Sequence, residues 1–214
     1  MLKIALISEH ASPLAAPGSV DCGGQNVYVA HVALELAQLG YVVDVFTRRE
    51  SATQKEIVRW RDNIRVVHVS AGPQQAIPKE QLLPYMPDFT QYIIDFSRSQ
   101  RSPYDLVHAN FFMSGLVAQQ VKQALGIPYV ITFHALGLVR RLSQGAADSF
   151  PTARVAIERQ LMQDADRIIA ECPQDRLDME RHYDADRSRI EIVPCGFDPL
   201  ELCPGQIGQR AARS

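Results

Sequence analysis

The sequence predicts an α/β protein built on an open, mostly parallel sheet with helices on both faces, a Rossmann-like arrangement. Short apolar runs that suit strands buried on both faces alternate with segments whose apolar residues repeat with the helical period. Hydrophobic residues make up 46% of the 214 residues and charged residues 21%, which is the usual balance of a protein with a buried core.

The first half of the chain begins with a strand, "KIALISE", at residues 3–9. A helix is expected at 25–39, because its apolar residues fall on one face: Val27, Ala30, Ala33, Leu34 and Ala37. Gly40 is suited to end this helix. The elements expected next are strands at 41–47 and 63–69 and, after a proline-bearing stretch, a helix at 89–99.

The second half repeats the alternation. Strands are expected at 105–110, 128–134, 166–172 and 190–196, with helices between them at 113–126, 152–165 and 174–183. Three prolines lie between 194 and 204, and no apolar periodicity follows them. We therefore expect one domain over residues 1–204 and a linker or disordered tail over 205–214.

Composition and cysteine spacing exclude several classes of function. The net charge of −2 gives no argument for a nucleic-acid partner, and no apolar run reaches the roughly 18 residues of a membrane span. The N-terminus lacks the apolar region of a signal peptide, so we expect a cytoplasmic protein. The cysteines fit no zinc site and are expected to be reduced thiols: Cys22, Cys172, Cys195 and Cys203.

Polar residues follow several of the expected strands. In open parallel sheets, ligands bind beyond the carboxyl ends of the strands. The residues at those ends are Glu9, His10, Asn110, His134, Glu171, Cys195 and Gly196. This edge of the sheet is therefore the candidate site, although a histidine such as His134 could also be a structural residue satisfied by the backbone.

Two adjacent glycines, Gly23 and Gly24, precede the first helix after an unusually long loop. Backbone N–H groups in such a turn can face an anion, and the helix dipole adds to the attraction. The residues form neither a G-x-G-x-x-G fingerprint nor a Walker loop. The alternative is a simple turn from loop to helix.

Five segments, in order, resemble the retaining glycosyltransferases of family 4, which have the two-domain GT-B fold. They are "GGQNVYVAHVALELAQLGYVVDVFTR", "LVHANFFMSGLVA", "PYVITFHALG", "ADRIIAECPQDRLDM" and "RIEIVPCGFD". The resemblance implies that residues 1–204 are the N-terminal, acceptor-binding domain. The E-x7-E motif of the donor-binding domain has no counterpart in the chain.

The resemblance also implies the reaction and its partners. A hexose would pass from a UDP- or GDP-sugar to a hydroxyl of a small sugar, sugar-phosphate or lipid-linked acceptor. The partners would be these two substrates and the protein's own C-terminal donor domain, with no nucleic acid. No cofactor and no metal are expected, and a membrane surface is left open.

Site residues carry over position by position. Gly23 and Gly24 would approach the donor diphosphate. Gln25 and Asn26 would bind sugar hydroxyls, for which an amide offers both a donor and an acceptor. His134 matches the family's histidine near the transferred sugar, where it would orient the reacting centre.

The remaining candidates would bind the acceptor. Asn110 and Glu171 lie at strand ends, although Glu171 could instead cap the helix that follows it. Lys79 and Arg154 match basic residues of relatives that use phosphorylated acceptors, and each could also be an ordinary surface charge. Two neighbours depart from that pattern: Phe111 stands where a tyrosine can occur, and Ala135 where a threonine can. Both changes remove a hydroxyl that could bond a phosphate.

Two other functions remain open from the residues alone. The chain could be a stand-alone, non-catalytic module that binds a sugar, a phosphate or a partner protein. It could also be a nucleotide-binding or flavodoxin-like domain of another class, against which the missing fingerprint counts.

Overall fold

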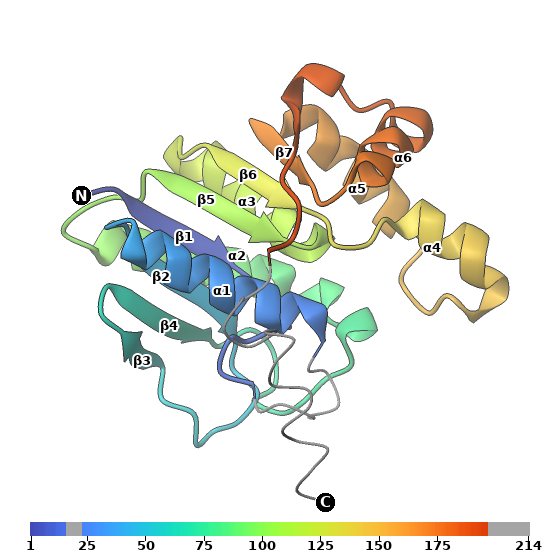
Figure 1. The fold of residues 1–214 in the computed structure, drawn as a ribbon. Helices are drawn as coiled ribbons and strands as arrows, with labels where there is room; N and C mark the ends of the chain where they lie inside the picture. The colour runs from blue at the N-terminus through green and yellow to red at the C-terminus, as the bar shows by residue number, and fades with distance from the viewer. Residues whose placement is uncertain (16–22, 197–214) are drawn as a thin grey trace, which may run out of the picture.

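A computed structural model describes residues 1–15 and 23–196 and contains one eight-stranded sheet (Figure 1). The order across the sheet is β3-β4-β2-β1-β5-β6-β7-β8, and every neighbouring pair is parallel except β3 and β4. The strands are β1 (Lys3–Ile7), β2 (Val42–Arg48), β3 (Ile57–Arg61), β4 (Ile64–Val69), β5 (Leu106–Asn110), β6 (Tyr129–Thr132), β7 (Arg167–Ala170) and β8 (Ile190–Ile192). The predicted fold class is confirmed.

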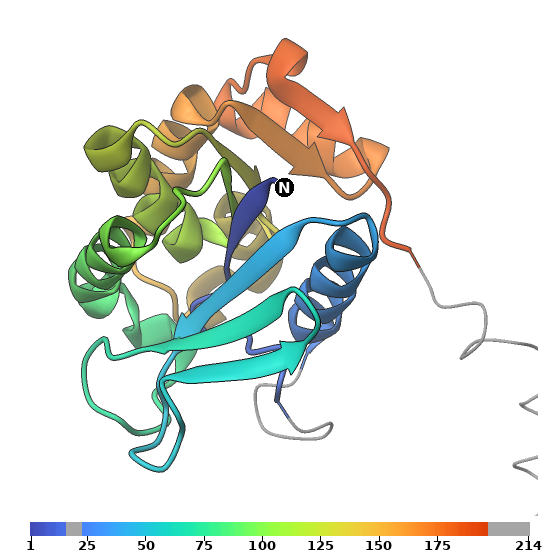
Figure 2. The same cartoon turned by 90° about the vertical axis from the view of Figure 1, so that its left-hand side faces the viewer.

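Helices cover both faces of the sheet (Figure 2). They are α1 (Gly24–Gln38), α2 (Met86–Ser99), α3 (Phe112–Leu125), α4 (Gly137–Gln144), α5 (Arg154–Asp164) and α6 (Pro173–Tyr183). Helix α1 packs through Val29 and Ala33 on one face, and α2 and α3 contribute to the larger core on the other. In the part of the chain that the structure describes, no helix has both the length and the apolar character to cross a membrane.

Two elements of the structure are absent from the sequence prediction. Strand β3 is an antiparallel edge strand whose residues alternate between exposed and half-buried positions, so it lacks a continuous apolar run. Helix α4 has two adjacent arginines and only one buried residue, Gly137. The strands predicted at 128–134 and 166–172 end earlier, at Thr132 and Ala170, and the residues beyond them form loops. The tail predicted at 205–214 lies outside the described residues.

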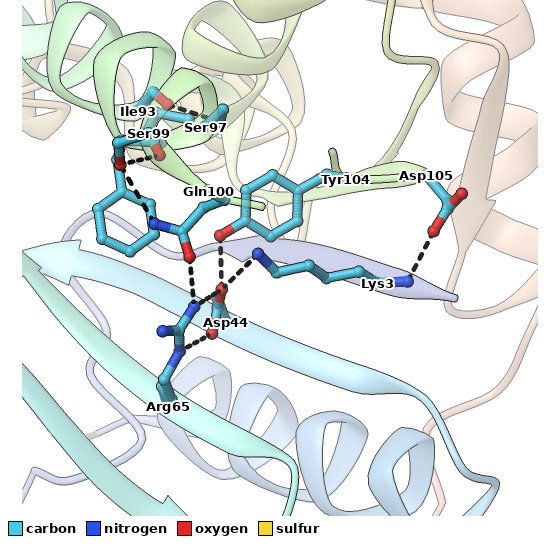
Figure 3. Close-up of polar contacts among 10 residues, drawn as sticks. Lys3, Asp44, Arg65, Ile93, Ser97, Ser99, Gln100, Tyr104 and Asp105 are labelled. Carbon is cyan, nitrogen blue, oxygen red and sulfur yellow. Dashed lines mark hydrogen bonds and ion pairs between the residues drawn. The ribbon is translucent and has the colours of Figure 1, made fainter. Parts of the chain in front are cut away.

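A buried ion cluster fixes the end of the sheet where the strands begin (Figure 3). The carboxylate of Asp44, with no exposed surface, accepts two hydrogen bonds of 2.6 Å from Arg65 and one of 2.5 Å from the Tyr104 hydroxyl. The Lys3 ammonium lies 3.5 Å away. Burial and the Asp44 charge raise the pKa of Tyr104, so its hydroxyl stays a donor. This cluster joins β1, β2 and β4 and leaves the opposite edge free for function.

Candidate functional site

Three of the predicted site residues meet at the carboxyl edge of the sheet. Asn110 ends β5, His134 lies two residues beyond β6, and Glu171 directly follows β7. The His134 ring Nε2 lies 3.0 Å from Asn110 Oδ1, and its Nδ1 lies 3.0 Å from Glu171 Oε1. Neighbouring parallel strands end together, which is why residues 24 and 37 positions apart come into contact.

The hydrogen bonds show how this cluster is held together. The Asn110 amide donates to the Ile7 carbonyl at 3.2 Å, which leaves its oxygen facing the His134 ring. Both ring nitrogens therefore lie beside oxygen atoms. Burial raises the pKa of Glu171, but the hydrogen bond and charge of His134 outweigh it and bring the net pKa below its ordinary value. Glu171 is therefore a carboxylate held against the His134 ring.

Tyr28, together with Thr132 and His108, packs beside His134. The Tyr28 ring meets the His134 ring edge-on at 4.8 Å, and its hydroxyl lies 3.4 Å from the Thr132 hydroxyl. Thr132 in turn lies 2.9 Å from His108 Nε2. Burial, with a smaller contribution from the His134 charge, lowers the pKa of His108 to about 4, so this ring is neutral near pH 7. Sequence reasoning missed Tyr28, because a tyrosine in the first turns of an amphipathic helix carries no signal of its own.

The glycine turn lies next to this cluster. Helix α1 begins at Gly24, and its first turn is on the same side of the sheet as the arrowheads of β1 and β5 (Figure 1). The Gln25 amide donates to the Ser8 hydroxyl at 3.2 Å and lies 3.4 Å from the Asn110 carbonyl. The N-terminus of α1 is thereby tied to the strand that carries Asn110.

Nothing in the part of the chain that the structure describes requires glycine at these two positions. Gly23 has extended backbone, φ −121° and ψ −173°, which any residue adopts. A Cβ atom added at Gly23 or Gly24 would meet no described atom within 4 Å. What the glycines leave is open space in front of a helix N-terminus, as a closely approaching ligand would need.

Asn26 is occupied by the loop that precedes the helix. Its side chain is 6% exposed, accepts a 3.0 Å hydrogen bond from the Gly23 N–H and donates one of 2.9 Å to the Ser12 carbonyl. The Gly23 N–H, expected to be free for an anion, is therefore taken; the Gly24 N–H has no partner among the described residues. Sugar binding by Asn26 stays a prediction, and its observed contacts close the turn.

The two basic residues expected to bind an acceptor lie apart. Lys79 begins the short 3-10 turn Lys79–Gln81 beyond β4, and its side chain forms no hydrogen bond or ion pair with the residues that the structure describes. Arg154 is 1% exposed and lies behind the loop that follows His134, where its guanidinium donates to Glu158 Oε1 at 2.7 Å and to the Ala135 carbonyl at 2.5 Å. Their roles as acceptor ligands stay predictions.

A separate polar group completes the edge beside β1. The Glu9 carboxylate has no exposed surface, accepts from the Ser114 hydroxyl of α3, and lies 2.8 Å from His10 Nδ1. The His10 ring packs edge-on against Phe111 at 5.1 Å. Ser114 carried no sequence signal, since it is one hydroxyl within a helical pattern.

This edge is an open surface with little enclosed space of its own. The cavity beside His134 and Glu171 holds about 20 Å³, too little for a sugar ring. Another hollow among the described residues, about 420 Å³, lies beside the amino end of β7, where Lys122 is paired with Asp164 and Asp166. We place the candidate site at the carboxyl edge of the sheet, because Asn110 and Glu171 both contact His134 there. Within residues 1–15 and 23–196, no group of three or more His, Cys, Asp or Glu could hold a metal.

The fold and the comparisons with known proteins identify the chain as the N-terminal domain of a GT-B glycosyltransferase of family 4. The chain belongs to the glycosyl transferase 4-like domain family, whose model matches residues 23–196. It is 37% identical over 204 residues to the D-inositol 3-phosphate glycosyltransferase of Corynebacterium kroppenstedtii, covering 95% of this chain and 45% of that protein. The same enzyme of Kineococcus radiotolerans is 37% identical over 215 residues, covering 99% and 49%.

The solved structures agree with this assignment. Sucrose-phosphate synthase from Thermosynechococcus elongatus matches with a TM-score of 0.91 at 28% identity, over 100% of this chain and 53% of that one. The chain therefore spans about half the length of these relatives.

Proposed function

We propose that this chain is the acceptor-binding half of a retaining glycosyltransferase. The complete enzyme would transfer a hexose from a UDP- or GDP-sugar to a hydroxyl of a small acceptor. The observation that carries the proposal is the His134–Asn110–Glu171 cluster beside the N-terminus of α1. The relatives, which are named as glycosyltransferases, support it.

In this proposal the chain contributes position and charge. The donor diphosphate approaches Gly24, where the helix dipole and a free N–H stabilise the negative charge that grows as the sugar leaves. The His134 ring, oriented by Asn110 and Glu171, hydrogen-bonds a sugar hydroxyl. The acceptor proton passes to a donor phosphate oxygen, so no side chain of this half has to form a covalent bond to the sugar, and catalysis rests on placement and electrostatics. No metal or cofactor is required.

The test is sugar transfer by residues 1–196 joined to the donor-binding half of the C. kroppenstedtii relative, with nucleotide-sugars and small polyols or sugars as substrates. His134→Ala should lower kcat/KM by about 100-fold, the scale for a lost electrostatic contact in a transfer reaction. His31→Ala removes an exposed histidine from α1 and is the matched control, with unchanged kcat/KM expected.

Undiminished transfer in His134→Ala would remove the site assignment. A folded chimera that binds the donor but transfers no sugar would instead favour the stand-alone binding module.

A further inference from the structure

Arg154 contacts both positions, Phe111 and Ala135, at which the sequence departs from the phosphate-binding pattern. The Arg154 guanidinium lies 4.8 Å from the Phe111 ring centroid, and its Nη2 donates to the Ala135 carbonyl at 2.5 Å. The rings of Phe112 and Phe150 lie 5.0 and 4.5 Å from the same guanidinium. Three aromatic rings and a backbone carbonyl thus surround the Arg154 guanidinium.

The charge of Arg154 is already balanced. Glu158, with no exposed surface, accepts from Arg154 Nε at 2.7 Å within the same helix. Nη1 is buried and has no hydrogen-bond partner in the described part of the chain, but the surrounding rings offer it their negative faces. A phosphate bound here would have to lose its hydration and displace those rings. It would also meet a guanidinium whose charge is already paired with that of Glu158.

What Arg154 and Glu158 hold is the loop that carries His134. The Glu158 carboxylate accepts from the Gly137 N–H at 3.0 and 2.9 Å and from the Tyr183 hydroxyl at 2.6 Å. The Tyr183 hydroxyl accepts from the Leu138 N–H at 2.8 Å. With the Ala135 carbonyl bound by Arg154, three of the four residues after His134 are fixed through their backbone.

This anchoring matters because of the conformation of His134. Its φ of 60° lies in the left-handed region, which residues other than glycine rarely adopt. This conformation costs about 1 kcal/mol or more. The surrounding structure must hold the residue there. The fit is also tight, since a Cβ at Gly137 would lie 2.9 Å from Arg154 Nε and from Glu158 Oε2.

We propose that Arg154 is a positioning residue for His134 and that it does not bind anions, so that the acceptor carries no phosphate monoester at this point. The statement about the acceptor rests on the proposed function, whereas the positioning role of Arg154 does not. One buried network contains Arg154, Glu158 and Tyr183. It holds the loop after His134 and thereby orients the His134 ring.

The first test reads the His134 ring directly in the 214-residue chain, by side-chain ¹H–¹⁵N NMR, with His134→Gln used to assign its signals. The wild type should show ring signals set by the contacts of His134 with Asn110 and Glu171. Arg154→Met should change the chemical shifts of these ring signals, because the loop that carries His134 loses an anchor, and the milder Tyr183→Phe should do so to a smaller extent.

Val45→Ala removes buried apolar contacts on the α1 side of the sheet and is the control for a general loss of stability, with unchanged His134 signals expected. Signals unchanged in both Arg154→Met and Tyr183→Phe would overturn the proposal. If Arg154→Met does not fold, Arg154→Lys replaces it, since lysine keeps the charge but cannot bridge Glu158 and Ala135.

The second test is a titration with inorganic phosphate, followed by the same spectra. The wild type and Arg154→Lys should respond equally and without saturation. Saturable binding to the wild type that weakens tenfold or more in Arg154→Lys would show an anion site and overturn the proposal. Neither test requires turnover, so a failure of the proposed transferase activity remains distinguishable.

Discussion

The neutral, buried His108 makes the stability of this chain depend on pH in a defined window. Burial lowers its pKa from the ordinary 6.5 to about 4, and the charge of His134 adds to this effect. Between these values the unfolded chain binds a proton at His108 and the folded chain does not. As far as His108 is concerned, the free energy of unfolding is therefore highest above pH 6.5, and it falls as the pH falls toward 4.

The magnitude follows from the two values. At about 1.4 kcal/mol for each tenfold change in a proton equilibrium, the difference between 6.5 and about 4 is worth about 3 kcal/mol at most. At about pH 4.5, about 2.5 kcal/mol of the free energy of unfolding should be lost through this residue. Thr132 bonds the neutral ring, so the ring needs no proton to be satisfied.

Urea unfolding of the wild type and of His108→Gln, compared at neutral pH and at about pH 4.5, measures this contribution, since the other titrating groups are common to both proteins. The wild type should lose about 2.5 kcal/mol more than the variant over this range. Equal losses in the two proteins would refute the reasoning and show that His108 is protonated or hydrated in the folded state.

Two further predictions concern stability. Asp44→Asn should lower the free energy of unfolding by about 3 kcal/mol, because it removes a fully buried carboxylate that pairs with the partly buried Arg65 and Lys3. Asp166→Asn, whose side chain is 42% exposed, should change it by less than about 1 kcal/mol. Equal effects of the two substitutions in urea unfolding would contradict the assigned role of burial. Gly115→Ala should cost about 1–3 kcal/mol, because its Cβ would lie 2.5 Å from Ile131 Cδ1 and 2.6 Å from Leu161 Cδ1. A melting temperature equal to that of the wild type would show that the side-chain ends of Ile131 and Leu161 can shift without loss.

The sequence predicts the alternating part of the fold well, because strands buried on both faces leave continuous apolar runs. It does not predict β3, whose pairing with β4 at the edge of the sheet buries only alternate residues. Helix α4 is missed because it is only eight residues long and has one buried residue, Gly137, so it is too short to stand out as a helix in the sequence.

The candidate site divides in the same way. Asn110, His134 and Glu171 could be grouped in advance, because the ends of neighbouring parallel strands must meet. Arg154 could not be placed, because its burial depends on aromatic rings from α3 and from the segment before α5, and no local pattern encodes that enclosure. The sequence also does not show which partners an amide side chain will have. Asn26 is suited to bind a sugar hydroxyl, but it bonds the backbone of Gly23 and Ser12 in the structure.

The central claim is that the open edge beside α1 exists for a ligand, and Gly24 tests it most directly because nothing in the described part of the chain requires glycine there. In the two-domain chimera, Gly24→Val should change the free energy of unfolding by less than about 1 kcal/mol. The same substitution should lower kcat/KM for sugar transfer by about 100-fold, because the side chain stands where the diphosphate would approach. Transfer at the wild-type rate in this variant would contradict the account.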